Sequence, residues 1–319
     1  MAIVVVGEAV VDFLPAPDGS FRPLPGGSPL NVATGLARLG APSAYLWALS
    51  SDLFGDLFRR HLAEAGVDLS LTATVDRPST LAFVAMRQGQ PVYAFFDEGS
   101  AGRMFDPAAV ALPEETALVH AGSYVLACEP VGASIERCLR AARGRGISVS
   151  LDVNVRKSLV ADPEAYRARL QRLFRLANIV KASEEDIFWL APGAAAEDFA
   201  AARLADGAEL AVVTLGGEGA LLAAGGHRLR VAAPEIAFVD AVGAGDAFMS
   251  ALLGGLFRRG LLGLTAVAAE ADLLAVLDES VAAGGIACSR AGADPPTRAE
   301  LDAFVESWRA SGPGDSLGP

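Results

Sequence analysis

The sequence predicts an α/β fold with a mostly parallel sheet flanked by helices. Residues 3–6 form a β-branched run that ends at Gly7, as expected for a buried strand. From residue 117 onward, strand-like and helix-like stretches alternate, and this order favours parallel strands joined by crossover helices. Apolar residues make up 52% of the 319 residues, which is enough to bury a substantial core.

The first expected helix follows a pair of glycines. Ser28 is its predicted N-cap, Pro29 is its first residue, and Gly40 ends it. Leucine and alanine recur between these points at helical spacing, which supports the assignment. A strand over residues 43–49 and a helix over residues 52–65 are expected next.

Residues 72–96 alternate in the manner of strands, with a turn at Gln88, Gly89 and Gln90. A hairpin that interrupts a series of strands and helices is an insertion into that series. Together with residues 20–25, it is expected to form a small sheet separate from the main one.

The second half of the chain supplies the rest of the main sheet. The expected strands and helices alternate in the order 117–121, 131–144, 147–151, 163–176, 178–181, 184–190, 198–205 and 210–215, where 184–190 and 198–205 are consecutive helices. A hairpin over residues 219–232 turns through Gly225 and Gly226. The remainder is mostly helical and ends in a helix at 298–309.

Composition and charge exclude several kinds of function. The net charge of −12 would repel the phosphate backbone, so no nucleic-acid partner is expected. No uncharged apolar stretch of about 18 residues occurs, so no membrane span is expected. Three widely spaced cysteines without a C-x-x-C pair indicate a reducing compartment and predict a cytoplasmic location. The chain also lacks G-x-x-x-x-G-K-[ST], which excludes a kinase of the usual P-loop type.

Residues 240–249, D-A-V-G-A-G-D-A-F-M, carry the strongest chemical signal. Gly243, Ala244 and Gly245 precede Asp246 and a helical pattern, so backbone N–H groups are expected to converge there and bind an anion such as phosphate. Phosphate repels a neighbouring carboxylate, so Asp246 makes sense there if it takes a proton from an attacking hydroxyl. The alternative is a helix N-terminus with an ordinary acidic first turn.

Two polar residues lie where an α/β sheet binds its ligands. Asp12 follows the first strand and is a candidate for hydrogen-bonding a polyol, although it also fits a turn before Pro15. Gly27 belongs to a glycine pair that lets backbone approach a ligand, and Asn31 offers both a donor and an acceptor in the first helical turn. A capped helix alone would explain most of this second pattern.

Two of these stretches resemble signatures of the ribokinase-like (PfkB) carbohydrate kinases. D-A-V-G-A-G-D-A-F resembles D-T-x-G-A-G-D, with Ala241 at the threonine position. G-G-S-P-L-N-V-A over residues 26–33 resembles G-G-x-x-x-N-x-A. The resemblance covers about residues 2–305 and implies a doubly wound, mostly parallel sheet with a small β-sheet lid.

The resemblance also implies a domain organisation. A single kinase domain would occupy residues 1–312. Its lid would be formed by about residues 12–25 and 70–98, inserted in the α/β core. Residues 313–319 would form a flexible tail. Family members often dimerise through the lid sheet, so a homodimer is expected.

The resemblance carries roles over to residues of both signatures. Asp246 would accept the proton of the primary hydroxyl of a sugar, and the amides of Gly243, Ala244 and Gly245 would bind phosphoryl oxygens. The sugar would be held by Asp12, Gly27, Asn31, Phe96, Arg103 and Arg156. For Arg103 and Arg156, an exposed surface charge is the alternative.

Two stretches are implied to bind ATP and its Mg²⁺. Residues 213–220, V-T-L-G-G-E-G-A, resemble the nucleotide-binding turn of the family. Residues 181–186, K-A-S-E-E-D, resemble a motif that orders Mg²⁺ through water, with Asp186 at the usual Glu position and Glu185 beside it. Without the resemblance, this second stretch reads as a capped helix start. The implied nucleotide-binding residues are Ser183, Thr214, Gly216, Gly217, Gly219, Ala283 and Gly284.

Two further features follow from the family alone. Val281 stands where many members have Asn or His, so a polar contact to the purine from that side chain is missing. A K⁺ ion is implied beneath the anion-binding turn, with Asp240, the Val242 carbonyl and the loop at 288–292 as its ligands.

The choice of sugar rests on finer resemblances. Residues 7–13, 122–130 and 152–156 look most like bacterial fructokinases. In 2-keto-3-deoxygluconate kinases an Arg after an aromatic pair reads the substrate carboxylate, whereas here Asp97 follows Phe95 and Phe96. We interpret Asp97 as a charge that repels acid sugars.

The expected reaction is transfer of the γ-phosphate of ATP to D-fructose, which gives fructose 6-phosphate. The alternatives are a 2-keto-3-deoxygluconate kinase, a nucleoside or ribose kinase, and a non-catalytic sugar sensor. An intact Asp246 argues against the sensor, because a sensor has no need of a catalytic base.

Overall fold

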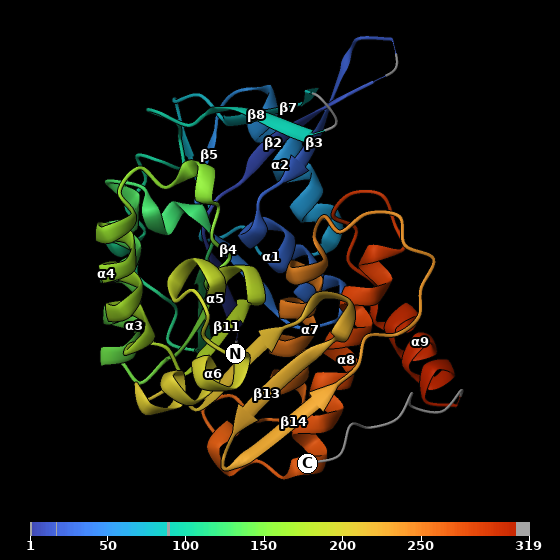
Figure 1. Ribbon diagram of the computed structural model, residues 1–319. Coiled ribbons are helices and arrows are strands. Elements are labelled where there is room, and N and C mark those ends of the chain that lie inside the picture. The colour runs from blue at the N-terminus through green and yellow to red at the C-terminus, as the bar shows by residue number, and fades with distance from the viewer. Residues whose placement is uncertain (1, 17, 88–89, 311–319) are drawn as a thin grey trace.

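An eight-stranded sheet forms the centre of the computed structural model, which describes residues 2–16, 18–87 and 90–310 (Figure 1). Its strands stand in the order β14-β13-β12-β11-β10-β9-β1-β4. The first six along the chain run parallel, and the last two form an antiparallel hairpin at one edge. The strands are β1 Ala2–Val6, β4 Ser43–Leu46, β9 Thr116–Gly122, β10 Ser148–Asp152, β11 Ile179–Ser183, β12 Leu210–Thr214, β13 Ala220–Ala224 and β14 His227–Val231. The predicted α/β fold is confirmed.

Helices cover both faces of this sheet (Figure 1). The chain moves from β1 to β4 in one direction and from β9 to β12 in the other, so right-handed crossovers place the two sets of helices on opposite faces. One face carries α1 Ser28–Arg38, α7 Ala244–Arg258 and α8 Glu270–Cys288, with α2 Leu53–Ala65 and α9 Arg298–Ala310 beside them. The other carries α3 Val131–Gly144, α4 Pro163–Phe174, α5 Glu184–Leu190 and α6 Ala196–Ala205.

Short 3-10 helices lie in several connections: η1 Pro107–Ala109, η2 Tyr124–Ala127, η3 Lys157–Leu159, η4 Gly216–Glu218 and η5 Thr265–Val267.

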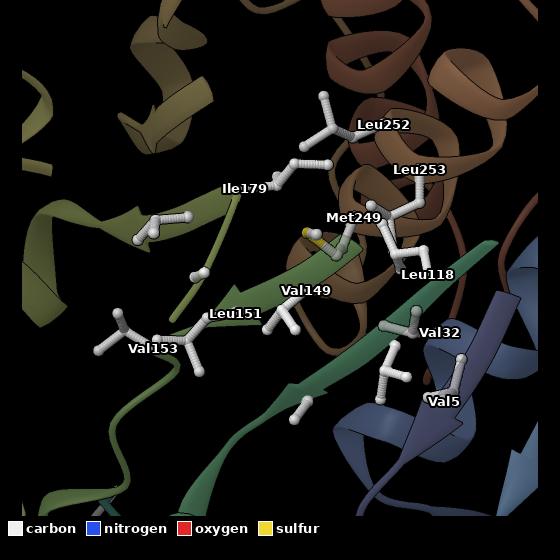
Figure 2. Close-up of a cluster of buried hydrophobic side chains, with 14 of the residues drawn as sticks. Val5, Val32, Leu118, Val149, Leu151, Val153, Ile179, Met249, Leu252 and Leu253 are labelled. Atoms are coloured by element: carbon white, nitrogen blue, oxygen red, sulfur yellow. The ribbon is translucent and has the colours of Figure 1, made fainter. Parts of the chain in front are cut away.

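Helix α7 is buried over residues 246–256, because its middle is apolar all round. Figure 2 shows Met249, Leu252 and Leu253 of α7 in one cluster with Leu118 and Val149 of the central strands. This packing fixes the axis of α7, and therefore the position of its N-terminus.

A second, four-stranded sheet lies over one end of the main sheet and corresponds to the expected lid (Figure 1). Its order is β3-β2-β7-β8, with β2 Val10–Pro15, β3 Phe21–Gly26, β7 Thr80–Arg87 and β8 Gln90–Phe96. Residues 12–25 were expected to belong to the lid, but no strand was predicted over β2, because Asp12 was interpreted as a residue just past the first strand. The chain instead leaves β1 at Gly7 and enters the lid within three residues.

Two other details differ from the sequence expectations. The strand expected over 43–49 is interrupted at Trp47, and β5 Ala48–Ser50 pairs with β6 Ala73–Val75 in a separate two-stranded sheet. Residues 88–89 of the expected turn and the tail at 313–319 lie outside the described residues. Within the described ranges, no helix combines the length and the apolar character needed to span a membrane.

Glu279, in the middle of α8, connects the C-terminal end of α7 with the first residue of α9. Its side chain is only 9% exposed and accepts hydrogen bonds from Arg258 at 2.6 Å, Arg259 at 2.7 Å and Arg298 at 2.9 Å. Burial alone would raise the pKa of Glu279, but the hydrogen bonds from Arg259 and Arg298 outweigh it and lower the pKa. The carboxylate therefore stays ionised and holds three guanidinium groups.

We expect Glu279→Gln to lower the free energy of unfolding by about 3 kcal/mol, because it leaves three partly buried guanidinium groups without a counter-charge. Urea denaturation measures this loss. The neighbouring Asp278→Asn is the control, since its partner Arg309 is 53% exposed and the pair is expected to contribute less than about 1 kcal/mol. Equal losses in the two variants would contradict this account.

Candidate active site

The N-termini of α1 and α7 meet, and their contact is made by one carboxylate. Asp246 is 7% exposed, and its Oδ1 accepts a hydrogen bond from the Ser28 hydroxyl at 2.6 Å. Its Oδ2 accepts one from the side-chain amide of Asn31 at 2.8 Å. The Asn154 amide in turn donates to the Ser28 hydroxyl at 2.9 Å. The structure thus brings the two predicted signatures together at a single side chain.

Gly27, not Ser28, is the N-cap of α1, which corrects the sequence prediction. Gly27 has φ of 108°, and a Cβ there would lie 2.5 Å from the carbonyl oxygen of Glu8. Only glycine fits both this backbone conformation and this close approach. Ser28 therefore begins the helix itself, and its hydroxyl is free to bind Asp246 instead of capping.

The turn before α7 has the shape of an anion site. Gly243 is the N-cap of α7 in the left-handed conformation, and a Cβ on it would lie 2.7 Å from Ala293. The Ala244 amide is used in a turn hydrogen bond to Ala241. Among the described residues, the amides of Gly245 and Asp246 make no hydrogen bond, as is usual in a first helical turn. These donors and the helix dipole favour a negatively charged ligand beside Asp246.

Asp12 lies in lid strand β2, and its carboxyl group lies against Gly26, two residues before α1 begins. Burial raises the pKa of Asp12 to about 6, against a lowering by the positive charge of Arg156. At neutral pH the carboxylate is ionised and can accept hydrogen bonds from hydroxyl groups. A Cβ on Gly26 would collide with the Asp12 carboxyl group, so a glycine there leaves room for it. Arg156 is exposed and lies on the same side.

Glu8 is a buried acid that sequence reasoning did not select. It is 2% exposed, it lies between Gly7 and the lid, and its Oε2 has no hydrogen-bond partner among the described residues. Burial raises the pKa of Glu8 to about 8, although Ser123 and Arg156 lower it. At pH 7 this carboxyl group is protonated. The sequence did contain a signal for this buried acid, because Glu8 is a charged residue within an apolar stretch after the first strand.

The lid register separates two aromatic side chains. Asp12 pairs with Ala82, which pairs with Phe95, so these three share a face. Phe96 lies on the other face, where its ring is 6.0 Å from that of Phe83, and it is 59% exposed. Phe95 packs edge-on against Tyr124 at 5.0 Å. The register therefore places Phe95 on the same face of the lid as Asp12, and Phe96 on the opposite, exposed face.

Asp97 is paired within the protein. Its Oδ1 accepts hydrogen bonds from Thr80 at 2.7 Å and Ser100 at 3.0 Å, and its Oδ2 accepts one from Arg103 at 2.9 Å. The Arg103 Nε also donates to the Glu129 carbonyl oxygen at 2.5 Å. Asp97 is therefore a carboxylate that is paired within the protein, and the charge of Arg103 balances its own. Arg103 itself has correspondingly fewer groups to offer a sugar.

Apart from Ser183 at the end of β11, the predicted nucleotide-binding residues come from two places. Thr214 is the last residue of β12, and Gly216, Gly217 and Gly219 follow it, at the carboxyl end of a strand where α/β sheets bind ligands. A Cβ on Gly219 would collide with the Val231 carbonyl, so this glycine is required by the hairpin.

The second place is helix α8. Ala283 is buried in it, and Gly284 is close enough to the Ala244 carbonyl that a Cβ would lie 3.4 Å away. Val281 is 5% exposed and packs in the core, so its side chain lies in the apolar interior. Small residues of α8 thus lie behind the anion-binding turn.

Ser183 and Asp186 form a capping box at the start of α5, which confirms the reading made without the resemblance. The Asp186 carboxylate accepts hydrogen bonds from Val155 N at 2.7 Å, and from Ser183 N and Ser183 Oγ at 2.8 Å each. It is 4% exposed, whereas Glu185 is exposed beside it. Of the two acids, Glu185 is the one open to water.

Asp240 organises the segment before the anion-binding turn. Its Oδ1 accepts a hydrogen bond from Val242 N at 3.1 Å, and its Oδ2 accepts one from Gly292 N at 3.0 Å. These contacts connect the turn to the 288–292 loop, as the predicted cation site requires. Within the described ranges, no three His, Cys, Asp or Glu side chains cluster so as to hold a metal ion by themselves.

A base held beside an anion site is what an enzyme that phosphorylates a hydroxyl group needs. Comparison with known proteins agrees: residues 2–300 match the model of the pfkB family of carbohydrate kinases. The chain belongs to this family, and it is a phosphotransferase that acts on a sugar hydroxyl.

Its relatives include several fructokinases. The chain is 37% identical to the fructokinase of Rhizobium leguminosarum bv. trifolii over 82% of this chain and 81% of that protein. It is 34% identical to an Escherichia coli fructokinase over 93% and 97% of the two chains. Among solved structures, a Vibrio cholerae O395 fructokinase double mutant with fructose, ADP and a potassium ion bound matches with a TM-score of 0.84, 28% identity and coverage of 95% and 98%. A Xylella fastidiosa fructokinase with bound ATP matches with a TM-score of 0.88, 26% identity and coverage of 96% and 98%.

The raised pKa of Glu8 makes the stability of the protein depend on pH. Between pH 4.5 and 8 the folded protein keeps the Glu8 proton while the unfolded chain releases it, so this contribution weakens as pH rises. Relative to Glu8→Gln, which does not titrate, we expect the wild type to lose about 1.4 kcal/mol of unfolding free energy per pH unit over this range. Urea titrations of both proteins from pH 5 to 8 measure it. If the unfolding free energies of the two proteins changed with pH in parallel, a raised pKa of Glu8 would be ruled out.

Proposed function

We propose that the protein transfers the γ-phosphate of ATP to the primary hydroxyl of D-fructose and yields fructose 6-phosphate. The observation that carries the proposal is the Asp246 carboxylate, held by Ser28 and Asn31 in a helical turn with open amides. Several relatives in the family are fructokinases that match over most of their length. Fructose and ADP bound together in the Vibrio cholerae O395 structure support the same reaction.

In this mechanism each protein group has one task. Asn31 and Ser28 orient the Asp246 carboxylate so that it accepts the proton of the sugar hydroxyl as the oxygen attacks phosphorus. The amides of Gly245 and Asp246 stabilise the charge that develops on the phosphoryl oxygens. Asp12 accepts hydrogen bonds from other sugar hydroxyls, and Gly27 lets the backbone approach the sugar closely.

The exposed carboxylate of Glu185 fits a role in holding Mg²⁺ through water, because Mg²⁺ prefers oxygen ligands and retains much of its hydration. Asp186 fixes the helix that presents Glu185. When bound, Mg²⁺ neutralises phosphate charge during the transfer. We expect Glu185→Gln to raise the Mg²⁺ concentration needed for half-maximal rate. A wild-type rate that does not depend on Mg²⁺ would contradict this site.

A potassium site beside Asp240 and the Val242 carbonyl is part of the proposal. It is supported by the hydrogen bonds that hold Asp240 between the turn and the 288–292 loop, and by the potassium ion bound in the Vibrio cholerae O395 structure. A cation there would support the backbone of the anion-binding turn. An equal rate of sugar phosphorylation in KCl and in tetramethylammonium chloride would contradict the proposed potassium site.

We further propose a cytoplasmic homodimer formed through the lid. Phe13 and Phe83 stack at 4.4 Å, Phe21 packs edge-on against Phe83, and Phe96 extends the cluster with more than half of its surface exposed. A second copy would cover this aromatic face. Sedimentation of wild type and of Phe96→Asp tests it, since the proposal requires a dimer that the added charge weakens.

The sugar panel is the test of the proposed reaction. Coupled ATP turnover is measured with fructose, 2-keto-3-deoxygluconate, ribose and adenosine, and turnover of fructose is expected to be highest. Because Arg103 pairs with Asp97 and the positive charge of Arg156 acts on Asp12, a keto acid is the alternative substrate to test. Higher turnover of the keto acid would refute fructose and assign its carboxylate to Arg156.

Asp246→Asn is the matched variant for this panel, since it keeps the shape of the side chain and removes the base. We expect it to bind the sugar and to lose at least about 10²-fold in kcat. Near wild-type turnover in this variant would contradict the assignment of the base. Sugar binding by wild type without turnover of any of the four compounds would favour a sensor.

A further inference from the structure

A buried lysine lies against the anion-binding turn. Lys181, at the end of β11, is 4% exposed, and its Nζ donates hydrogen bonds to Asp152 Oδ1 at 3.0 Å and Oδ2 at 2.8 Å. A Cβ on Gly245 would lie 3.5 Å from the same Nζ. The ammonium group is therefore in contact range of the turn whose amides are open. Neither signature of the family contains this residue.

The donor count leaves one N–H group of Lys181 available. An ammonium has three N–H donors and no acceptor. Among the described residues, its hydrogen bonds go to Asp152 alone, and they use two of the three. The third is left for a ligand on the side where Gly245 lies.

The local charges require a positive group here. Asp152, Asp186 and Asp246 lie close enough that the charges of the last two raise the pKa of Asp152, although burial is the larger cause. A phosphoryl group adds further negative charge to this cluster. Lys181 is the cation that the structure pairs with it, and the low-dielectric surroundings strengthen its effect.

The residue type itself is informative. Lys157 and Lys181 are the only lysines among 26 basic residues, and all others are arginine. An ammonium is a compact point charge, whereas a guanidinium is broad and planar. The space between Asp152 and Gly245 suits the compact ammonium group better than a guanidinium group.

We propose that Lys181 is a catalytic residue whose ammonium group contacts a γ-phosphoryl oxygen during transfer, and that Asp152 is the positioning residue that holds it there. This inference rests on the proposed function. The bond between the sugar oxygen and the γ-phosphorus forms, the bond from that phosphorus to the bridging oxygen of ADP breaks, and the hydroxyl proton goes to Asp246. Lys181 keeps its protons throughout and stabilises the developing charge.

The experiment separates a catalytic charge from a structural ion pair. Lys181→Met alone leaves Asp152 buried and unpaired, so it is expected to lose both stability and turnover. The double variant Lys181→Met/Asp152→Leu replaces the pair with apolar side chains and is expected to regain stability in urea. Its kcat is nevertheless expected to stay about 10²-fold below that of wild type. The exposed Lys157→Met is the control and should match wild type.

A binding measurement gives a second readout. Affinity for ADP with aluminium fluoride and sugar, which imitates the transferring phosphoryl group, is expected to fall with kcat in the double variant. Affinity for ADP alone is expected to stay within about threefold of wild type. Recovery of kcat together with stability would overturn the proposal, because the pair would then be structural only.

Asp152→Asn covers the case in which the double variant does not fold. Asn keeps one acceptor for Lys181, so a catalytic ammonium predicts a much smaller loss of kcat than in Lys181→Met. Equal losses in these two single variants would overturn the proposal. Wild-type turnover of the sugar panel is measured in parallel, so a wrong sugar assignment is recognised separately from a wrong role for Lys181.

Discussion

The contact of Asp246 with Ser28 and Asn31 is the interaction on which the site depends. It joins two helices whose N-termini are more than two hundred residues apart in sequence. Each helix is fixed by other means: α7 by its apolar packing on the central strands, and α1 by the glycine that lets its start lie against Glu8. A carboxylate with both oxygens occupied by neutral donors cannot rotate freely. It is therefore oriented before any ligand binds.

Regular elements were predictable because their signals are local. The capping box at Ser183 and Asp186 and the hairpin through Gly225 could be read from adjacent residues. Pairing of the two signatures was also expected, though only through a resemblance. The lid strand β2 escaped prediction because only three residues separate it from β1 and a charged residue interrupts it, so Asp12 was taken for a ligand-binding residue just past the first strand.

The side-chain environment was less predictable, since it depends on contacts between distant segments. Asp97 looked like a free charge although Arg103 follows only six residues later, because the irregular chain between them has no spacing rule that indicates their pairing. Phe95 and Phe96 differ by one position, and only the register of the lid decides which ring faces inward. The burial of Glu8, Asp152 and Lys181 likewise depends on which strands and helices pack around them, and the local sequence does not show this.

The position of Asp12 has a consequence for affinity. This ligand candidate belongs to the lid sheet, whereas Asn31 and Asp246 belong to the main body. A sugar held by all three would cross-link two sheets, so its binding and the docking of the lid form a single equilibrium. The measured dissociation constant then contains the free energy of bringing the sheets together. Substitutions in the lid far from the sugar would weaken binding without removing any contact to it.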